Sequence, residues 1–268
     1  MFAKLLKYER KATAPLLSLL SLICLTTAAL CGGAIVLSKI TWENPIVETL
    51  IGLSVGLAFV IFVISVIAYC LAATLLVLYR FYKSKFTDEG YLTFTLPVKP
   101  GQLFLSSLLN LMFWQIISVC VIGLSLLLLF WIGGYLPDIG ATFRKLYGTF
   151  QEIFRYPGAP SFWILLPAGI ITWVFGNIMA MTCIVLGAAW AKKHKLLLAF
   201  ALYYGINCVL QFFLSLLSAG LILTQLENIN AAVFTNWLYG GPGIFYLLLT
   251  VGAYLLSIRM MSKKLNLP

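Results

Sequence analysis

The sequence predicts an all-α integral membrane protein whose chain crosses the bilayer six times. Hydrophobic residues make up 62% of its 268 residues and charged residues only 10%, whereas a soluble domain carries about 25% charged residues. Six apolar stretches approach or exceed the roughly 20 residues that a helix needs to cross the hydrocarbon layer. Uninterrupted apolar runs exclude the alternating strands of a membrane barrel. We therefore expect a single transmembrane domain over residues 1–268.

None of the expected spans contains Asp, Glu, Lys or Arg. The spans are residues 15–37, 50–78, 103–132, 162–190, 196–223 and 243–258. Fourteen of the 18 basic residues lie at the N-terminus, after the second span, after the fourth span or after the sixth. Because cytoplasmic loops carry the excess of Lys and Arg, both termini are predicted to be cytoplasmic. The net charge of +10 is then a topology signal, and these scattered basic residues predict no nucleic-acid partner.

The segment Met1–Thr13, ahead of the first span, predicts an amphipathic helix on the inner membrane surface. Phe2, Leu5 and Leu6 share one helical face, and the lysines fall mostly off it. A simple positively charged anchor explains the same residues, so both interpretations stay open. We expect this segment to be retained, since the following apolar run is longer than the roughly 7–15 residues of a signal-peptide core.

The chain carries few residues that could support catalysis. Its one histidine, His194, lies among three lysines, and its six cysteines all fall within expected spans, where packing explains them. A zinc site needs several convergent ligands, and no Gly-x4-Gly-Lys-Ser/Thr phosphate loop occurs in the sequence. We therefore predict no catalytic residue, metal site or cofactor in this chain. Any ATP-driven work would need a nucleotide bound by another chain.

Neutral polar residues lie deep in the expected spans: Gln115, Asn177, Asn207 and Gln211. The lack of buried charge argues against a proton- or ion-coupled carrier, which usually keeps acids or arginines inside the membrane. Asn207 and Gln211 are four residues apart and share a helical face. The four polar residues could line a cleft or could hydrogen-bond neighbouring helices.

The loop between the second and third spans carries most of the functional information. The second helix is expected to continue past its span through residues 78–83 into the cytoplasm, and an acidic pair at 88–89 then precedes Gly90. Pro97 and Pro100 end the loop before the third span. This pattern predicts a short helix near the membrane plane that exposes two acids among basic residues.

Three segments of this region form a family pattern: Asp88-Glu-Gly-Tyr-Leu92, Thr95-Leu-Pro-Val-Lys-Pro100 and Leu103-Phe-Leu-Ser-Ser-Leu-Leu109. The pattern resembles the ABC-2 type permeases, which are transmembrane subunits of ATP-binding cassette transporters. The six-span topology is similar to that of small permeases of Gram-positive bacteria linked to export of, or resistance to, drugs and antimicrobial peptides. Ser107 departs from the pattern, because many relatives have lysine there.

The resemblance implies a multi-pass permease in a bacterial plasma membrane. It would pair with a second permease chain, identical or related, and would be driven by a separate ATPase subunit that binds Mg-ATP. The coupling helix that meets the ATPase would comprise Lys85, Phe86, Thr87, Asp88, Glu89, Gly90, Tyr91 and Leu92. The two acids would face the ATPase, Gly90 would allow close approach, and Met1–Thr13 would form an interface helix in contact with membrane lipid.

Two segments on the expected outer side are rich in aromatic residues. Phe143, Tyr147, Phe150 and Phe154 recur at helical spacing among charged residues, which predicts a helix on the outer membrane surface. It would be an interfacial anchor or a substrate contact. The resemblance implies short re-entrant helices within residues 224–241, and an interfacial aromatic belt is the alternative.

The expected function is that of a permease subunit that exports drugs, antimicrobial peptides or lipid-like molecules, and the chain itself is not expected to be an enzyme. Two alternatives remain open at this point. One is an ATP-independent membrane carrier or channel. The other is a non-transporting scaffold for peptide sensing or immunity. The sequence does not identify the substrate, and it does not separate a homodimer from a heterodimer.

Overall fold

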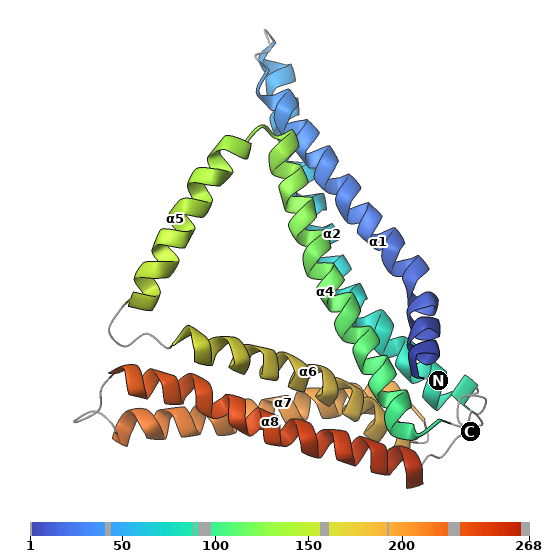
Figure 1. The fold of residues 1–268 in the computed structure, drawn as a ribbon. Helices are drawn as coiled ribbons and strands as arrows, with labels where there is room; N and C mark the ends of the chain where they lie inside the picture. The colour runs from blue at the N-terminus through green and yellow to red at the C-terminus, as the bar shows by residue number, and fades with distance from the viewer. Residues whose placement is uncertain are drawn as a thin grey trace. The chain divides into compact units, whose positions relative to one another are not determined.

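The computed structural model describes residues 2–40, 44–87, 89–90, 98–155, 161–191, 193–224 and 231–263. Within these ranges the chain forms seven helices and no strand. The helices are α1 (Phe2–Ser38), α2 (Pro45–Phe86), α4 (Pro100–Ile132), α5 (Leu136–Arg155), α6 (Phe162–Trp190), α7 (Lys195–Thr224) and α8 (Ala231–Lys263) (Figure 1). All except α5 are long and apolar enough to span a membrane. The prediction of six spans is confirmed, which indicates a multi-pass membrane protein.

The helix α2 is longer than one membrane crossing requires. Its 42 residues extend over about 63 Å at 1.5 Å per residue, roughly twice the 30 Å of the hydrocarbon layer. The last turns contain Lys83 and Lys85 and end at Phe86. The helix therefore continues beyond its apolar span, as the sequence predicts.

The helices α1 and α8 differ from the prediction at their N-terminal ends. The sequence predicts a surface helix before a span that begins at Pro15, but α1 runs unbroken from Phe2 to Ser38 with this proline inside it. Thr13 and Leu17, on either side of the proline, are both buried, so packing holds the helix together there. Similarly, α8 begins at Ala231 and runs through Pro242, so residues 231–242 do not form a separate re-entrant helix.

The chain divides into two compact units, and the helices α2, α4 and α5 pass from one to the other. The first unit comprises Met1–Arg80 and Leu109–Leu146, and the second comprises Phe81–Leu108 and Tyr147–Pro268. Within the first unit, α1, α2 and α4 pack around a core formed by Ala28, Cys31, Phe62 and Leu129. A hydrogen bond of 2.8 Å between the hydroxyls of Thr27 and Ser65 joins α1 to α2.

Within the second unit, α6 is the central helix and lies beside α7 and α8 (Figure 1). In the most apolar 18-residue stretch of α6, 56% of the residues are buried, whereas the buried share of the corresponding stretch is 6% in α7 and 17% in α8. Phe175 of α6 stacks on Tyr246 of α8 with 4.7 Å between ring centroids. Deeper along the same pair, the hydroxyl of Ser257 donates a hydrogen bond of 2.9 Å to Thr182. Aromatic and polar contacts thus join α6 to α8 over much of their length.

The end of α6 and the start of α7 approach each other closely, and a glycine makes this approach possible. A Cβ atom at Gly187 would lie 2.7 Å from the carbonyl oxygen of Lys195 and 2.9 Å from the Cβ of Ala199. His194, directly before α7, has a φ of 58°, in the left-handed region. This conformation costs most L-residues about 1–2 kcal/mol. The two helices can approach this closely only because the position lacks a side chain.

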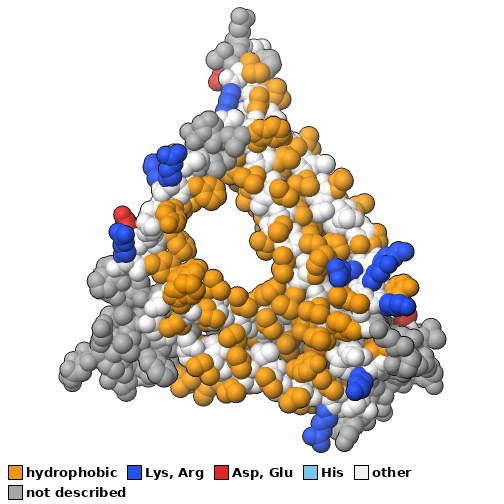
Figure 2. Space-filling model, viewed as in Figure 1, with side chains coloured by type: hydrophobic (Ala, Val, Ile, Leu, Met, Phe, Trp, Pro, Cys, Tyr) orange, Lys and Arg blue, Asp and Glu red, His pale blue; other side chains and the backbone are white. Residues whose placement is uncertain are grey.

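On the face shown in Figure 2, hydrophobic side chains are numerous along the helices, and charged side chains are few. Large apolar residues remain more than half exposed, among them Leu53, Leu57, Val209 and Leu248. Contiguous apolar surface of this extent marks contact with lipid or with another protein rather than with water.

Candidate functional site

Aromatic rings from both ends of the α2–α4 loop meet on α8. Phe81 and Phe86, in the last turns of α2, pack edge to face at 5.6 Å between centroids. Phe81 also meets Phe104 of α4 at 6.0 Å, and Phe104 meets Tyr254 of α8 at 5.7 Å. We call these four residues the loop-anchor cluster. Each such ring pair contributes about 0.5–1.5 kcal/mol beyond the burial of its area, so the cluster fixes both ends of the loop to one membrane-spanning helix.

The start of α4 packs tightly against α8 beside this cluster. A Cβ atom at Gly101 would lie 3.2 Å from the Cδ1 of Ile258 and 3.5 Å from the hydroxyl of Tyr254. Ser107, on the same part of α4, is 1% exposed, and its hydroxyl donates a hydrogen bond of 3.3 Å to the carbonyl of Leu103. A lysine at this buried position would place an ammonium among packed side chains at a high desolvation cost. The packing therefore explains the serine.

The acidic part of the loop begins directly after the cluster. The ammonium of Lys83 lies 3.5 Å from the carboxylate of Glu89, and the two side chains are 48% and 44% exposed. The backbone N–H of Gly90 donates a hydrogen bond of 2.7 Å to the carbonyl of Thr87, which closes a turn. The hydroxyl of Thr87 in turn donates to the carbonyl of Lys83. Glu89 is thus presented to solvent from a turn that is tied to the end of α2.

The remaining residues of the predicted coupling segment divide between core and undescribed chain. Lys85 and Phe86 are each 2% exposed, so they belong to the buried end of α2. Asp88, Tyr91 and Leu92 lie outside the described residues. Of the eight residues predicted to meet an ATPase, Glu89 is therefore the charged one that the described structure presents to solvent.

The four neutral polar residues, which could line a cleft or hydrogen-bond neighbouring helices, are divided between the two units. In the first unit, the amide of Gln115 donates a hydrogen bond of 3.5 Å to the hydroxyl of Thr74. In the second unit, the amides of Asn177 and Asn207 each donate to the carbonyl four residues earlier on their own helix, at 3.1 and 2.8 Å. Gln211 is exposed on α7. Two of the four amides are therefore paired with the backbone of their own helix.

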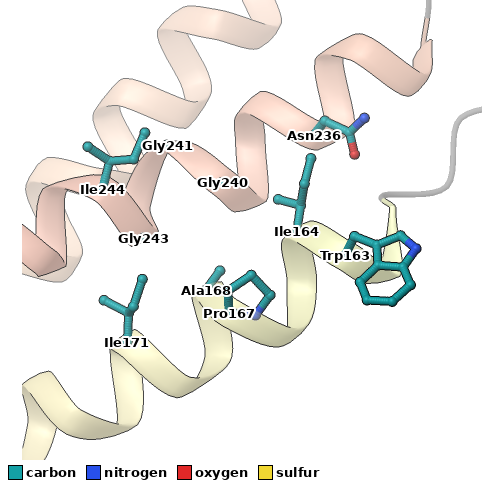
Figure 3. A pocket seen from close by; sticks show the side chains of 10 residues that line it. All are labelled: Trp163, Ile164, Pro167, Ala168, Ile171, Asn236, Gly240, Gly241, Gly243 and Ile244. Atoms are coloured by element: carbon teal, nitrogen blue, oxygen red, sulfur yellow. The ribbon is translucent and has the colours of Figure 1, made fainter.

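A groove that the sequence did not indicate lies between the N-terminal halves of α6 and α8, and Figure 3 labels the ten residues that line it. Its volume is about 400 Å³. Glycines bring the helices together there, because a Cβ at Gly240 would lie 3.1 Å from Ile164 and a Cβ at Gly243 would lie 3.2 Å from that of Ala168. The carboxamide oxygen of Asn236 accepts a hydrogen bond of 2.8 Å from the backbone N–H of Ser161 and so connects the two helix starts.

A proline lies inside each helix near this groove, Pro167 in α6 and Pro242 in α8. A proline has no N–H, so the carbonyl four residues earlier, at Trp163 and Leu238 respectively, loses its usual helical partner. Trp163 and Pro167 line the groove, and Leu238 and Pro242 line a neighbouring groove of about 520 Å³. Non-ideal backbone at membrane depth is tolerated where it is buried in protein or lines a cavity.

The described side chains of these sites offer ring contacts and apolar binding surface. No three His, Cys, Asp or Glu residues gather closely enough to hold a metal ion in the described ranges. No family model, curated protein or solved structure matches this chain. Function is therefore inferred from the residues and contacts themselves.

Proposed function

We propose that this chain is the transmembrane permease subunit of an ATP-binding cassette transporter of the ABC-2 type. It would cross a bacterial plasma membrane six times, with both termini and the α2–α4 loop in the cytoplasm. A separate ATPase subunit would bind Mg-ATP and dock on that loop, and a second permease chain would complete the pathway. The observation that carries the proposal is the loop-anchor cluster, which packs both ends of an acidic loop onto α8.

A docking loop can transmit force only if it is stiffly connected to a membrane helix. Phe81 and Phe104 are almost fully buried, and close-packed interiors transmit strain because they compress little. A displacement of the loop would therefore reach Tyr254 on α8. From Tyr254, α8 continues for about 17 Å to Gly243 at the groove. The helix α8 would thus couple the loop to the far ends of α6 and α8.

The charge pair beside the cluster suits a docking role. Lys83 and Glu89 are both close to half exposed, and an ion pair in such a setting contributes only about 0–1 kcal/mol. The carboxylate of Glu89 is therefore accessible to a basic residue of an ATPase. For transport, each nucleotide state of the ATPase must favour one arrangement of the spans through a difference in binding free energy.

The substrate class follows from the lining of the two grooves in the second unit. Their side chains are almost all apolar, which suits drugs, antimicrobial peptides or lipid-like molecules rather than ions or sugars. We propose export of such molecules, and we propose that this chain contributes no catalytic residue of its own.

Purification from the native membrane tests the proposal. The tagged full-length chain is extracted in mild detergent, and the co-purifying chains are identified by mass spectrometry. We expect a protein with a Gly-x4-Gly-Lys-Ser/Thr loop, and we expect its loss in the Asp88→Asn/Glu89→Gln double variant. Glu152→Gln, which removes an exposed acid from α5, serves as the matched control and should retain the partner.

The other outcomes distinguish the alternative functions. Recovery of this chain without any ATPase, together with substrate movement in proteoliposomes, would identify an ATP-independent carrier or channel. Recovery of an ATPase whose hydrolysis responds to a peptide, without movement of that peptide, would identify a sensing or immunity scaffold.

A further inference from the structure

The groove between α6 and α8 is built for an apolar occupant. Nine of its ten lining residues are apolar or glycine, and the exception is Asn236. The oxygen of this amide accepts a hydrogen bond from the backbone N–H of Ser161, so part of its polarity is satisfied within the protein. The volume of about 400 Å³ lies within the range of roughly 300–1,000 Å³ that ligand pockets occupy.

The groove opens onto the apolar outer surface of the unit. Trp163 and Ile244, which line it, are 85% and 64% exposed. Both helices belong to the set that is long and apolar enough to span a membrane. The medium around the membrane-spanning part of such helices is hydrocarbon rather than water. An exposed tryptophan near a helix start is typical of the headgroup level, so the groove extends inward from that level.

The last turn of α5 lies beside the start of α6 and ends in a positive charge. Phe154, near the end of α5, packs on Phe162 at 5.9 Å between centroids, and Phe162 packs on Trp163 at 6.3 Å. These contacts place the last turn of α5 beside the start of α6. Arg155, at the end of that turn, is exposed. A guanidinium binds phosphate oxygens with two parallel hydrogen bonds.

We propose that this groove binds an acyl chain of an anionic phospholipid whose phosphate contacts Arg155. The apolar lining would accept the acyl chain, and the guanidinium at the end of α5 would bind the phosphate. This inference rests on the groove that also supplies the proposed substrate class, but lipid binding itself requires only that the second unit lies in a membrane, so it can be tested without the ATPase.

Photo-crosslinking in a defined bilayer tests this site. The full-length protein is reconstituted into nanodiscs that contain phosphatidylglycerol with a photoreactive group in its acyl chain, and adducts are located by mass spectrometry. We expect adducts concentrated on the groove residues of α6 and α8. Gly241→Leu, at a groove position where an added Cβ meets no atom within 4 Å, should reduce them about tenfold, because the new side chain occupies the space of the acyl chain.

Three further variants make the result specific. Gly252→Leu adds the same side chain to α8 at another position where a Cβ meets no atom within 4 Å, outside the groove, and should leave the adducts unchanged. Arg155→Gln should reduce about tenfold the preference for phosphatidylglycerol over phosphatidylcholine, and Arg144→Gln should not. Adducts spread evenly over the lipid-facing helices, adducts that persist in Gly241→Leu, or cross-links to a second copy of the chain in place of lipid would overturn the proposal.

Discussion

The ring of Phe104 meets the ring of Tyr254 edge on, with 5.7 Å between centroids and 69° between ring planes. Phe104 lies in the first turns of α4, just after the loop, and it also contacts Phe81, just before the loop. One buried ring therefore connects both ends of the loop to α8. A displacement of both ends of the loop therefore has to displace α8 or break this contact.

A double-mutant cycle on Phe104 and Tyr254 measures the strength of this connection. We expect the coupling free energy between Phe104→Leu and Tyr254→Leu to be about 0.5–1.5 kcal/mol, the usual value for an edge-to-face ring pair. The free energy of unfolding is measured by denaturant titration of the purified chain in mixed micelles. As a control, Phe104→Leu is combined with Phe213→Leu, since Phe213 packs on Phe245 instead. A coupling near zero for both pairs would remove the physical basis of the loop-anchor cluster.

The close crossing of α6 and α7 predicts that Gly187→Ala destabilises the protein. The added methyl would lie 2.7 Å from the carbonyl oxygen of Lys195, and overpacking of this kind typically costs about 1–3 kcal/mol. Gly176→Ala on the same helix is the control, because a Cβ there meets no atom within 4 Å. It should be neutral or stabilising by up to about 1 kcal/mol. Equal effects of the two variants on the unfolding midpoint would contradict this close approach.

The hydrogen bonds of Thr13 predict that the stability of the first unit depends on its hydroxyl. Its hydroxyl accepts hydrogen bonds from the indole N–H of Trp114 at 2.8 Å and from the amide of Asn110 at 3.5 Å. Thr13→Val leaves these buried donors without their acceptor, which costs about 1–3 kcal/mol. The free energy of unfolding in micelles measures the loss. Thr13→Ser should restore most of the stability, whereas Thr26→Val, at an exposed position on α1, should change little.

The exposure of the Lys83–Glu89 pair predicts that replacing Glu89 changes association with the ATPase while leaving the stability of the fold almost unchanged. Because both side chains are close to half exposed, Glu89→Gln should lower the free energy of unfolding by less than about 1 kcal/mol. The proposed function expects the same variant to weaken association with the ATPase. Thermal unfolding and quantitative co-purification are measured on the same preparation. A variant that unfolds readily and loses its partner would show only that the loop is part of the fold.

The positions of the six spans could be predicted because length and apolarity alone determine them. The expected span 162–190 coincides with α6, and the expected 103–132 differs from α4 by three residues at its start. The expected first and sixth spans begin at Pro15 and Gly243, whereas α1 and α8 begin earlier and run through Pro15 and Pro242. A proline removes one hydrogen bond, and neighbouring helices can hold the rest of the helix together.

The loop-anchor cluster and the groove could not be predicted from the sequence. In a soluble helix an apolar stripe marks the buried face, but helices such as α4 are apolar on every side, so the pattern marks no face. Phe104 and Phe130 both lie among apolar residues of α4, and nothing in the sequence separates them, yet their side chains are 0% and 38% exposed. Only tertiary contacts distinguish a residue that packs on protein from one that faces lipid. The acidic pair could be located from sequence, whereas the contact of Phe104 with Tyr254 could not.

The central claim is that an ATPase docks on the loop between α2 and α4, and site-directed photo-crosslinking tests it most directly. A photoreactive phenylalanine analogue replaces Glu89 in the full-length chain, and in a second variant it replaces Ser38, which is exposed at the far end of α1. After irradiation of native membranes, we expect an adduct from position 89 to a protein with a Gly-x4-Gly-Lys-Ser/Thr loop and none from position 38. Lipid or solvent adducts alone from position 89, with the chain folded in the membrane, would contradict the claim.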